Sequence, residues 1–438
     1  FHSSRLFRIR RSGSATNAAT RVAPYSNSLQ DSPLNSGPMC FRSRLAHLLA
    51  KALLAVLIPM ALLVWPHALS AGAPNSTHLD SKNKCPSKRL SSMVGQTLMV
   101  GFPGRREEHR GVQAVLTQLR DGTVGGVVLF PKNIADEHQL KALIDTLRGP
   151  PSDLPPFIAV DQEGGAVQRL RARKGFEWFP PAKLVGQNPS LDAQDIAEQI
   201  YGLMAVELAG LGFNMNLGPV VDVDTNPQNP IIGARGRSFG DSADAVSPMA
   251  AAFINAHHAA NIATVAKHFP GHGSSAEDSH RTLADVSQSW REEELDPYRR
   301  LALQGLLDAV MMGHLYHPRF SDEVGLPASL SAKAVQALRS PDGLGFDGVI
   351  ISDDMEMGAI RERSSPEEAA VRAIKAGTDI VVLSNITRDD PEFGRRIHRA
   401  LIDAVCDGRI AEARIEEAYR RIVKLKEQIR TRALPQAW

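Results

Sequence analysis

The chain has 438 residues, of which 43% are hydrophobic and 22% are charged, and its formal net charge is +2. These proportions are typical of an ordinary globular protein, and the small net charge gives no indication of a nucleic-acid partner. The length would accommodate two or three average domains, or one large α/β barrel.

The charge is distributed unevenly. Residues 1–71 contain eight Lys or Arg residues and one acidic residue. Since the whole chain has 50 basic and 48 acidic residues, the remainder carries 42 basic and 47 acidic side chains, a net charge of −5. The basic excess therefore belongs to the N-terminal stretch, and the body of the protein is mildly acidic.

This N-terminal stretch has the order of a secretory signal. Basic residues follow Met39, an apolar run extends from Leu48 to Trp65, and small residues follow up to Ala71. Lys51 and Pro59 interrupt the run, which leaves it short of the ~20 apolar residues that span a bilayer, so cleavage is favoured over a retained anchor. We predict a disordered or untranslated leader at 1–38, a signal peptide at 39–71 and a polar lead-in at 72–88. The protein is expected to be periplasmic or secreted, with no stable membrane anchor after cleavage.

Two cysteines remain after the leader, Cys85 near the start of the predicted domain and Cys406 near its end. An exported protein can keep a disulfide, which would join these two regions. Two free buried thiols are an equal alternative at this point.

Short apolar runs rich in β-branched residues alternate with longer amphipathic stretches between residues 89 and 432. The alternation predicts parallel strands, helical crossovers and a single (β/α)₈ barrel. An open doubly wound sheet would require a Gly-rich phosphate loop after its first strand, and Gly101–Arg105 does not have that pattern. The predicted strands are 97–102, 125–130, 157–160, 213–223, 262–266, 309–312, 348–351 and 380–383. The predicted helices include 91–98, 112–120, 138–147, 191–211, 243–261, 291–307, 366–376, 392–405 and a final helix at 411–429.

Polar side chains collect after the C-terminal ends of these strands, where barrels carry their chemistry. They are Asp161 and Arg169 after the third strand, Arg237 after the fourth, Lys267 and His268 after the fifth, and Asp353 after the seventh. Such a mixture of fixed acids and bases suits a polyhydroxylated ligand, because carboxylates accept hydrogen bonds from hydroxyls and cations donate to them. An ionised Asp353 would be a competent nucleophile toward an anomeric carbon.

A second group must protonate the leaving oxygen. A second carboxylic acid is the usual solution in retaining glycosidases. His280 is the other option, because its imidazole titrates near neutral pH, and Asp278 could orient the ring.

Five motifs together resemble glycoside hydrolase family 3, most closely its bacterial β-N-acetylglucosaminidase branch. They are Asp161–Gly165, Arg237–Gly240, Lys267–Gly273, Asp278–His280 and Ile351–Met355, in the family's order between about residues 90 and 430. The resemblance implies a (β/α)₈ barrel and a retaining mechanism with Asp353 as nucleophile and Asp278–His280 as acid/base. It also implies that Asp161, Arg169, Arg237, Lys267 and His268 bind the sugar.

The resemblance further implies a substrate with terminal, non-reducing β-linked N-acetylglucosamine, and the expected export favours peptidoglycan fragments over chitooligosaccharides. The arginine loop Gly233–Ser238 is longer than the family's common form, which leaves Arg235 as an alternative to Arg237. The loop 274–277 also lacks the family's usual Asp after His272–Gly273. We expect a monomer that needs no cofactor or metal.

Three alternatives stay open at this point. A family 3 β-glucosidase or β-xylosidase would resemble the same barrel, but it usually takes its acid/base from a second domain, and we expect none here. A metal-dependent hydrolase could use His268, His272 and His280, although their spacing matches no recognised metal motif. A binding module that has lost activity is disfavoured by the intact Asp353 and His280.

Overall fold

The computed structural model describes residues 85–150, 152–386 and 388–432. The predicted leader and signal peptide, and all of the lead-in before Cys85, lie outside the described residues. Within the part that is described, no helix is long and apolar enough to cross a membrane.

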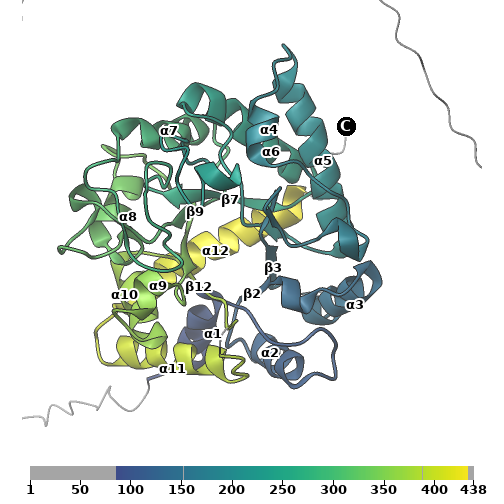
Figure 1. Ribbon diagram of the computed structural model, residues 1–438. Coiled ribbons are helices and arrows are strands. Elements are labelled where there is room, and N and C mark those ends of the chain that lie inside the picture. Colours follow the sequence, from purple (N-terminus) through teal and green to yellow (C-terminus); the bar gives the residue numbers. More distant parts are fainter. Residues whose placement is uncertain (1–84, 151, 387, 433–438) are drawn as a thin grey trace, which may run out of the picture. The chain divides into compact units, whose positions relative to one another are not determined.

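Eight parallel strands close into a barrel, which confirms the predicted fold (Figure 1). Around the barrel they are ordered β1–β12–β11–β9–β7–β6–β3–β2. Each lies within or overlaps one of the eight predicted runs. Their bounds are Leu98–Val100 (β1), Gly126–Leu129 (β2), Phe157–Val160 (β3), Met215–Asn216 (β6), Ala263–Phe269 (β7), Ala309–Met312 (β9), Val349–Asp354 (β11) and Ile380–Leu383 (β12).

Helices follow the strands and surround them (Figure 1). One of them, α8, was not among the helices named from the sequence. The longer helices are α1 (Lys88–Gln96), α2 (Arg110–Arg120), α3 (Glu137–Arg148), α5 (Ala193–Leu211), α6 (Ala243–Ala259), α7 (Asp296–Leu303), α8 (Ala332–Arg339), α10 (Pro366–Ala376), α11 (Phe393–Cys406) and α12 (Glu412–Arg432). Two short ones are α4 (Ala182–Gly186) and α9 (Gly358–Arg361), and a hairpin of β4 (Gln162–Gly164) and β5 (Val167–Gln168) follows β3.

The strands alternate between two cores, as their two-residue period requires. In β11, Val349 and Ile351 pack in the barrel interior, whereas Ile350 belongs to the larger core beneath the helices. The next inward position of this strand is Asp353. By the same alternation Ala159 in β3 precedes Asp161, and Val265 in β7 precedes Lys267. The pleat therefore turns these three polar side chains toward the barrel axis.

Helix α12 covers the amino end of the barrel. Its residues Ala418, Ile422 and Leu425 pack with the inward side chains of the strands. Lys426 is buried there, where its Nζ donates to Gln96 Oε1 at 2.7 Å and to Gly125 O at 3.1 Å. Figure 1 shows α12 crossing the middle of the ring of strands. With this end closed, the carboxyl end is the open face.

Cys85 and Cys406 form a disulfide. It joins the segment before α1 to the last residue of α11. The alternative of two free thiols is therefore wrong.

Candidate active site

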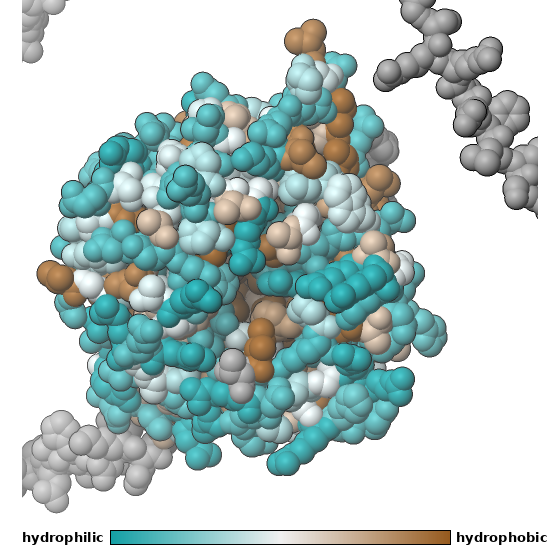
Figure 2. Space-filling model, viewed as in Figure 1, coloured by the Kyte–Doolittle hydropathy of each residue, from teal (hydrophilic) through white to brown (hydrophobic). Residues whose placement is uncertain are grey.

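A cavity of about 460 Å³ opens at the carboxyl end of the barrel. Figure 2 shows a recess in the middle of this face, with mostly hydrophilic residues around it. The cavity brings together every residue that the sequence assigned to the site. They are Asp161, Arg169, Arg237, Lys267, His268, Asp278, His280 and Asp353.

Asp353 lies near the end of β11. One of its oxygens, Oδ1, accepts a hydrogen bond from the Asp354 N–H at 2.8 Å. Burial alone would raise the pKa of Asp353, but the imidazoles of His314, His268 and His280 and the Asp354 N–H bring that pKa below its usual value. Asp353 is therefore an ionised carboxylate at neutral pH. His314 is itself fully buried and held by Ser329 Oγ at 2.7 Å and Asp354 O at 2.9 Å.

Lys267 stands between two carboxylates. Its Nζ lies 2.8 Å from Asp161 Oδ1 and 2.7 Å from Glu163 Oε1. Arg169 contacts the other Asp161 oxygen at 3.2 Å. Burial would raise the pKa of Asp161, but Lys267 and Arg169 hold that pKa well below its usual range. The result is a fixed, charged hydrogen-bond acceptor whose orientation is set by Lys267 and Arg169.

Arg237 is also held by Glu163, and it shares the oxygen Oε1 with Lys267. Its Nε and Nη2 donate to the two Glu163 oxygens at 2.8 and 2.9 Å, and its Nη1 donates to Ile231 O at 3.0 Å. This two-point pair fixes the plane of the guanidinium. The charges of Lys267 and Arg237 are thus largely balanced by Asp161 and Glu163 before a ligand arrives.

His268 is fixed by Asp222, which is fully buried. The His268 Nδ1–H donates to Asp222 Oδ2 at 2.7 Å, while Asp222 Oδ1 accepts the backbone N–H groups of His268 at 3.1 Å and His272 at 2.8 Å. With the proton on Nδ1, Nε2 is left as an acceptor, and Arg237 Nη2 lies 3.5 Å from it. Asp222 thereby sets both the orientation of His268 and the path of the loop that follows it.

Asp278 and His280 form a second pair on the loop that leaves β7. The His280 Nδ1–H and backbone N–H both donate to Asp278 Oδ1, at 2.9 and 3.0 Å. Side-chain exposure is 60% for His280 and 21% for Asp278, so the imidazole reaches into solvent at the cavity. This is the geometry of an oriented acid/base, with Nε2 left for a substrate.

The loop is tied to the segment after Asp353. Gly358 N donates to His280 O at 3.0 Å, and Ala359 N donates to Ser279 O at 3.3 Å. Gly358 and Ala359 are the first two residues of α9, and they lie four and five residues beyond the end of β11. These bonds therefore couple the position of His280 to that of Asp353.

His272 takes a structural role. It is fully buried, its Nε2 lies 3.0 Å from Ser279 Oγ, and burial together with the neighbouring His268 lowers its pKa to about 4. It does not line the cavity. Among the residues that the structure describes, no three His, Cys, Asp or Glu side chains are grouped as a metal site would need. The geometry gives no support to the alternative of a metal-dependent hydrolase.

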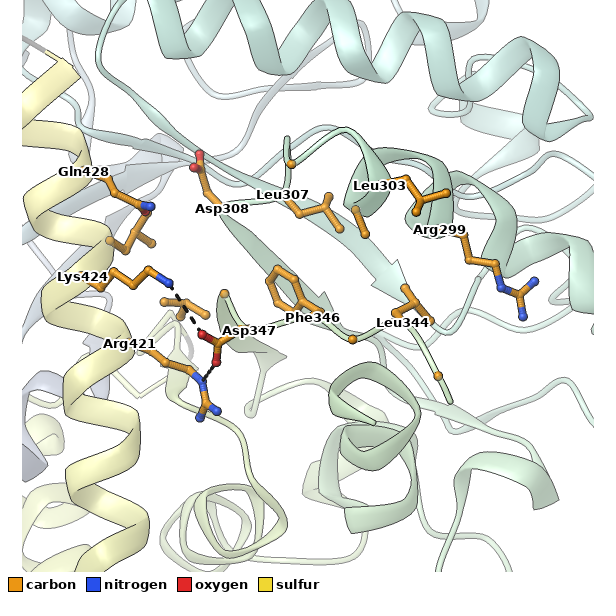
Figure 3. A pocket seen from close by; sticks show the side chains of 17 residues that line it. Arg299, Leu303, Leu307, Asp308, Leu344, Phe346, Asp347, Arg421, Lys424 and Gln428 are labelled. Atoms are coloured by element: carbon orange, nitrogen blue, oxygen red, sulfur yellow. Dashed lines mark hydrogen bonds and ion pairs between the residues drawn. The ribbon is translucent and has the colours of Figure 1, made fainter. Parts of the chain in front are cut away.

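A second cavity, of about 480 Å³, lies at the amino ends of β9 and β11 against α12 (Figure 3). Figure 3 shows Asp347 beside Arg421 and Lys424, at 3.3 and 3.6 Å. Asp308 is paired with His258 and Arg432, each at 2.7 Å. Because both acids are neutralised by structural partners, we assign the chemistry to the carboxyl end.

Two residues of the site were not assigned to it from the sequence. Glu163 lies in the motif Asp161–Gly165, at the β4–β5 hairpin. Its contact with Arg237 could not be predicted, because the two residues are 74 positions apart in the sequence. Asp222 holds the loop after β7 through the His272 N–H, and it also orients His268. The signal available in the sequence was an acid shortly after the predicted strand 157–160 for Glu163 and an acid within the predicted run 213–223 for Asp222. Neither position shows the partner of the side chain.

A model of the glycosyl hydrolase family 3 N-terminal domain matches residues 90–425. Together with the barrel and the site, this match shows that the chain belongs to glycoside hydrolase family 3.

Individual relatives support this family assignment. A protein named beta-hexosaminidase from Tolumonas auensis is 38% identical over 271 residues, which cover 61% of this chain and 77% of that protein. The solved family 3 β-N-acetylglucosaminidase from a Paenibacillus species is 34% identical with a TM-score of 0.71, and the match covers 80% of this chain but only 64% of that one. The β-N-acetylhexosaminidase structure from Beutenbergia cavernae is 31% identical with a TM-score of 0.68, covering 77% of this chain and 98% of that one.

Proposed function

We propose that the protein is a retaining exo-β-N-acetylglucosaminidase that removes terminal, non-reducing β-linked N-acetylglucosamine. The observation that carries this proposal is the presence in one cavity of an ionised carboxylate, Asp353, and an oriented imidazole, His280. The choice of N-acetylglucosamine as the sugar is supported by the names of the relatives. The barrel interior forms the floor of the cavity through side chains such as Met311 and Val382, so a chain end can enter but a chain cannot pass through.

In the first step Asp353 attacks the anomeric carbon, and its Oδ2 is the oxygen free of the Asp354 bond. A carbon–oxygen bond forms to Asp353 while the bond to the leaving sugar breaks. The His280 imidazolium gives its Nε2 proton to the departing oxygen, and Asp278 stabilises the Nδ1–H. The products are a glycosyl-enzyme ester and the released aglycone.

In the second step neutral His280 takes a proton from water, whose oxygen attacks the same carbon. The ester bond to Asp353 breaks, and the carboxylate and the imidazolium are restored. Two inversions at the carbon retain the β configuration. Asp161, Arg169, Arg237, Lys267 and His268 hold the sugar hydroxyls meanwhile.

We further propose that the substrates are peptidoglycan fragments and that the protein acts outside the inner membrane. The signal-like stretch supports export. The Cys85–Cys406 disulfide adds support, because disulfides persist in oxidising compartments and are rare in the cytosol.

Substitution of the nucleophile tests the mechanism. Asp353→Asn should lower kcat for an aryl β-N-acetylglucosaminide by at least about 10⁴-fold with the fold preserved, because an amide cannot form the ester. Asp403→Asn, the same change at an exposed position of α11 that does not line the cavity, is the matched control. When the wild type is tested with an aryl N-acetylglucosaminide, an aryl glucoside and an aryl xyloside, it should hydrolyse the N-acetylglucosaminide. Near wild-type activity in the Asp353→Asn variant would exclude Asp353 as the nucleophile.

A further inference from the structure

Arg235 lies at the mouth of the cavity, in the arginine loop Gly233–Ser238. The loop begins with a 3₁₀ helix, η4 (Gly233–Arg235), ended by Gly236 at φ 63°. Arg235 Nε donates to Pro230 O at 3.1 Å, which holds the stem of the side chain. The side chain is exposed and lines the same cavity as Asp278 and His280. It is therefore an ordered cation at the edge of the active site.

Arg235 differs from the other cations of the cavity in having no acidic partner. Arg169, Arg237 and Lys267 each form an ion pair at 3.2 Å or less. Within the described ranges, no carboxylate oxygen lies within 4.0 Å of the Arg235 guanidinium. With Nε held by Pro230 O, the two terminal nitrogens are available as a planar fork, a geometry that matches a carboxylate.

Arg235 lines the cavity together with Asp278 and His280. In the proposed reaction His280 marks the leaving-group side, because it must reach the oxygen between the two sugars. Burial would raise the pKa of Asp278, but the hydrogen bonds and charge of His280, and then the charge of Arg235, hold that pKa below its usual value. Arg235 is thus close enough to the dyad for its charge to act there. An aglycone bound against His280 would therefore lie beside Arg235.

The rim near Pro131, which also lines the cavity, carries further positive charge. Arg105 Nε donates to Lys132 O at 2.7 Å, and Lys174 Nζ donates to Pro131 O at 3.1 Å. Burial and the charges of the neighbouring arginines, Arg105 first, lower the pKa of Lys174. Lys132 is paired with Asp389 at 2.8 Å, so Arg105 and Lys174 supply the positive charge beside Pro131. Positive charge next to the cavity favours an anionic ligand.

We propose that Arg235 forms a subsite that binds a carboxylate on the aglycone, so that the enzyme prefers β-N-acetylglucosaminides whose leaving sugar is anionic. This inference rests on the proposed function and adds a specificity-determining residue to it. The carboxylate has two possible sources on a cell-wall fragment, the lactyl ether of a muramic residue and a peptide attached to it.

A matched pair of substrates tests the subsite. N-acetylglucosaminyl-β-1,4-N-acetylmuramic acid and N,N′-diacetylchitobiose, here called chitobiose, differ by the lactyl group of the leaving sugar. Arg235→Gln should lower the ratio of kcat/KM for the acidic substrate to that for chitobiose by about tenfold or more, which is the loss expected for a charge-assisted hydrogen bond. The change should fall mainly on KM, and Arg235→Lys should recover part of the ratio because it restores the charge without the fork.

The control is Arg110→Gln, which removes an exposed arginine of α2 that does not line the cavity. It should keep the wild-type ratio. Two further substrates separate the two sources of the carboxylate: the lactyl methylamide, which lacks the lactyl carboxylate, and the disaccharide with an attached peptide. The effect of Arg235→Gln on kcat/KM will appear with the free lactyl acid, with the peptide form or with both. An Arg235→Gln ratio equal to that of the wild type on all of these substrates would overturn the proposal.

Failure of the proposed function can be distinguished from failure of the Arg235 subsite. If the wild type hydrolyses no N-acetylglucosaminide, the activity is wrong and the subsite is tested by binding alone. Calorimetry should then show tighter binding of N-acetylmuramic acid than of N-acetylglucosamine, and Arg235→Gln should abolish the difference. Equal binding of the two sugars by the wild type would reject the subsite.

Discussion

Glu294 is a buried carboxyl group beneath the turn that leads out of β7. Its Oε2 accepts the Gly273 N–H at 3.1 Å. Gly271 passes so close that a Cβ added there would lie 2.6 Å from Glu294 Cβ, and its φ of +124° also favours glycine. Burial, with a smaller contribution from the charge of Asp222, raises the pKa of Glu294 to about 7.

This raised pKa predicts a pH-dependent stability. Below the unfolded pKa near 4.5, Glu294 is protonated in both states and its contribution is fully present. As pH rises toward 7 the unfolded state ionises first, and the contribution is lost. Relative to Glu294→Gln, the unfolding free energy of the wild type should therefore fall between pH 4.5 and 7.5, by on the order of 3 kcal/mol at most.

Urea unfolding at several pH values measures this difference. Glu293→Gln, at the exposed neighbouring position, is the control and should track the wild type at every pH. A constant difference between wild type and Glu294→Gln across this range would contradict the assignment.

Single residues were predictable from sequence where the strand itself points them inward. Asp161 and Asp353 follow buried runs at the alternate position, and Lys267 does so in β7. Glu163 and Asp222 were not, because their role is a contact across the barrel mouth rather than a place on a strand. Arg237 and Arg235 could not be separated by sequence, since only the turn at Gly236 shows that one is buried and the other exposed.

At the scale of elements, the site depends on the contact between the acid/base loop and α9. Gly358, the first residue of α9, packs against the backbone of the loop. A Cβ added to Gly358 would lie 2.1 Å from Arg281 O and 2.8 Å from His280 O. These are backbone atoms, so a side chain at this position must displace the loop.

Gly358→Ala should therefore move His280 away from the oxygen it protonates and lower kcat by about tenfold to 10²-fold. Gly210→Ala provides the matched control, because nothing lies within 4 Å of the added atom on α5. Steady-state kinetics, with circular dichroism to verify folding, gives the comparison. If Gly358→Ala and Gly210→Ala have the same kcat, the loop is not positioned by α9.

The strands were predictable as elements because short apolar runs rich in β-branched residues are typical of buried strands. The residues at which the strands begin and end were less predictable. The predicted run 213–223 contributes only Met215–Asn216 to the barrel as a strand. Beyond Pro219, which has no N–H for the ladder, the run pairs with β7 only through an isolated bridge between Val220 and Lys267. By contrast β7 continues to Phe269, because Lys267 and Phe269 pair with β9 beyond the apolar run. The eight-residue helix α8 was not predicted, and the predicted helix 291–307 is observed only as α7 (Asp296–Leu303) after a 3₁₀ turn at Glu292–Leu295.

At the scale of the whole molecule, the alternation of strands and helices was enough to predict the closed barrel. The disulfide was not predictable, because Cys85 and Cys406 are 321 residues apart and their separation gives no indication of proximity. Closure of the barrel brings them together, since β1 pairs with β12 and so places α1 near α11. The bond therefore connects the two ends of the described domain, while α12 packs across the amino end of the barrel.

Loss of this bond should lower stability without removing activity. The Cys85→Ser/Cys406→Ser variant should unfold at lower urea concentration, with a free energy of unfolding reduced by about 2–4 kcal/mol, because the unfolded chain is no longer constrained. Neither cysteine lines the active-site cavity, so kcat at 25 °C should stay close to that of the wild type. Either single substitution should cost about as much as the double one, since each removes the same bond. Reductant should bring the wild type to the variant's midpoint and leave the variant where it is; equal midpoints for oxidised and reduced wild type would show that the bond contributes nothing.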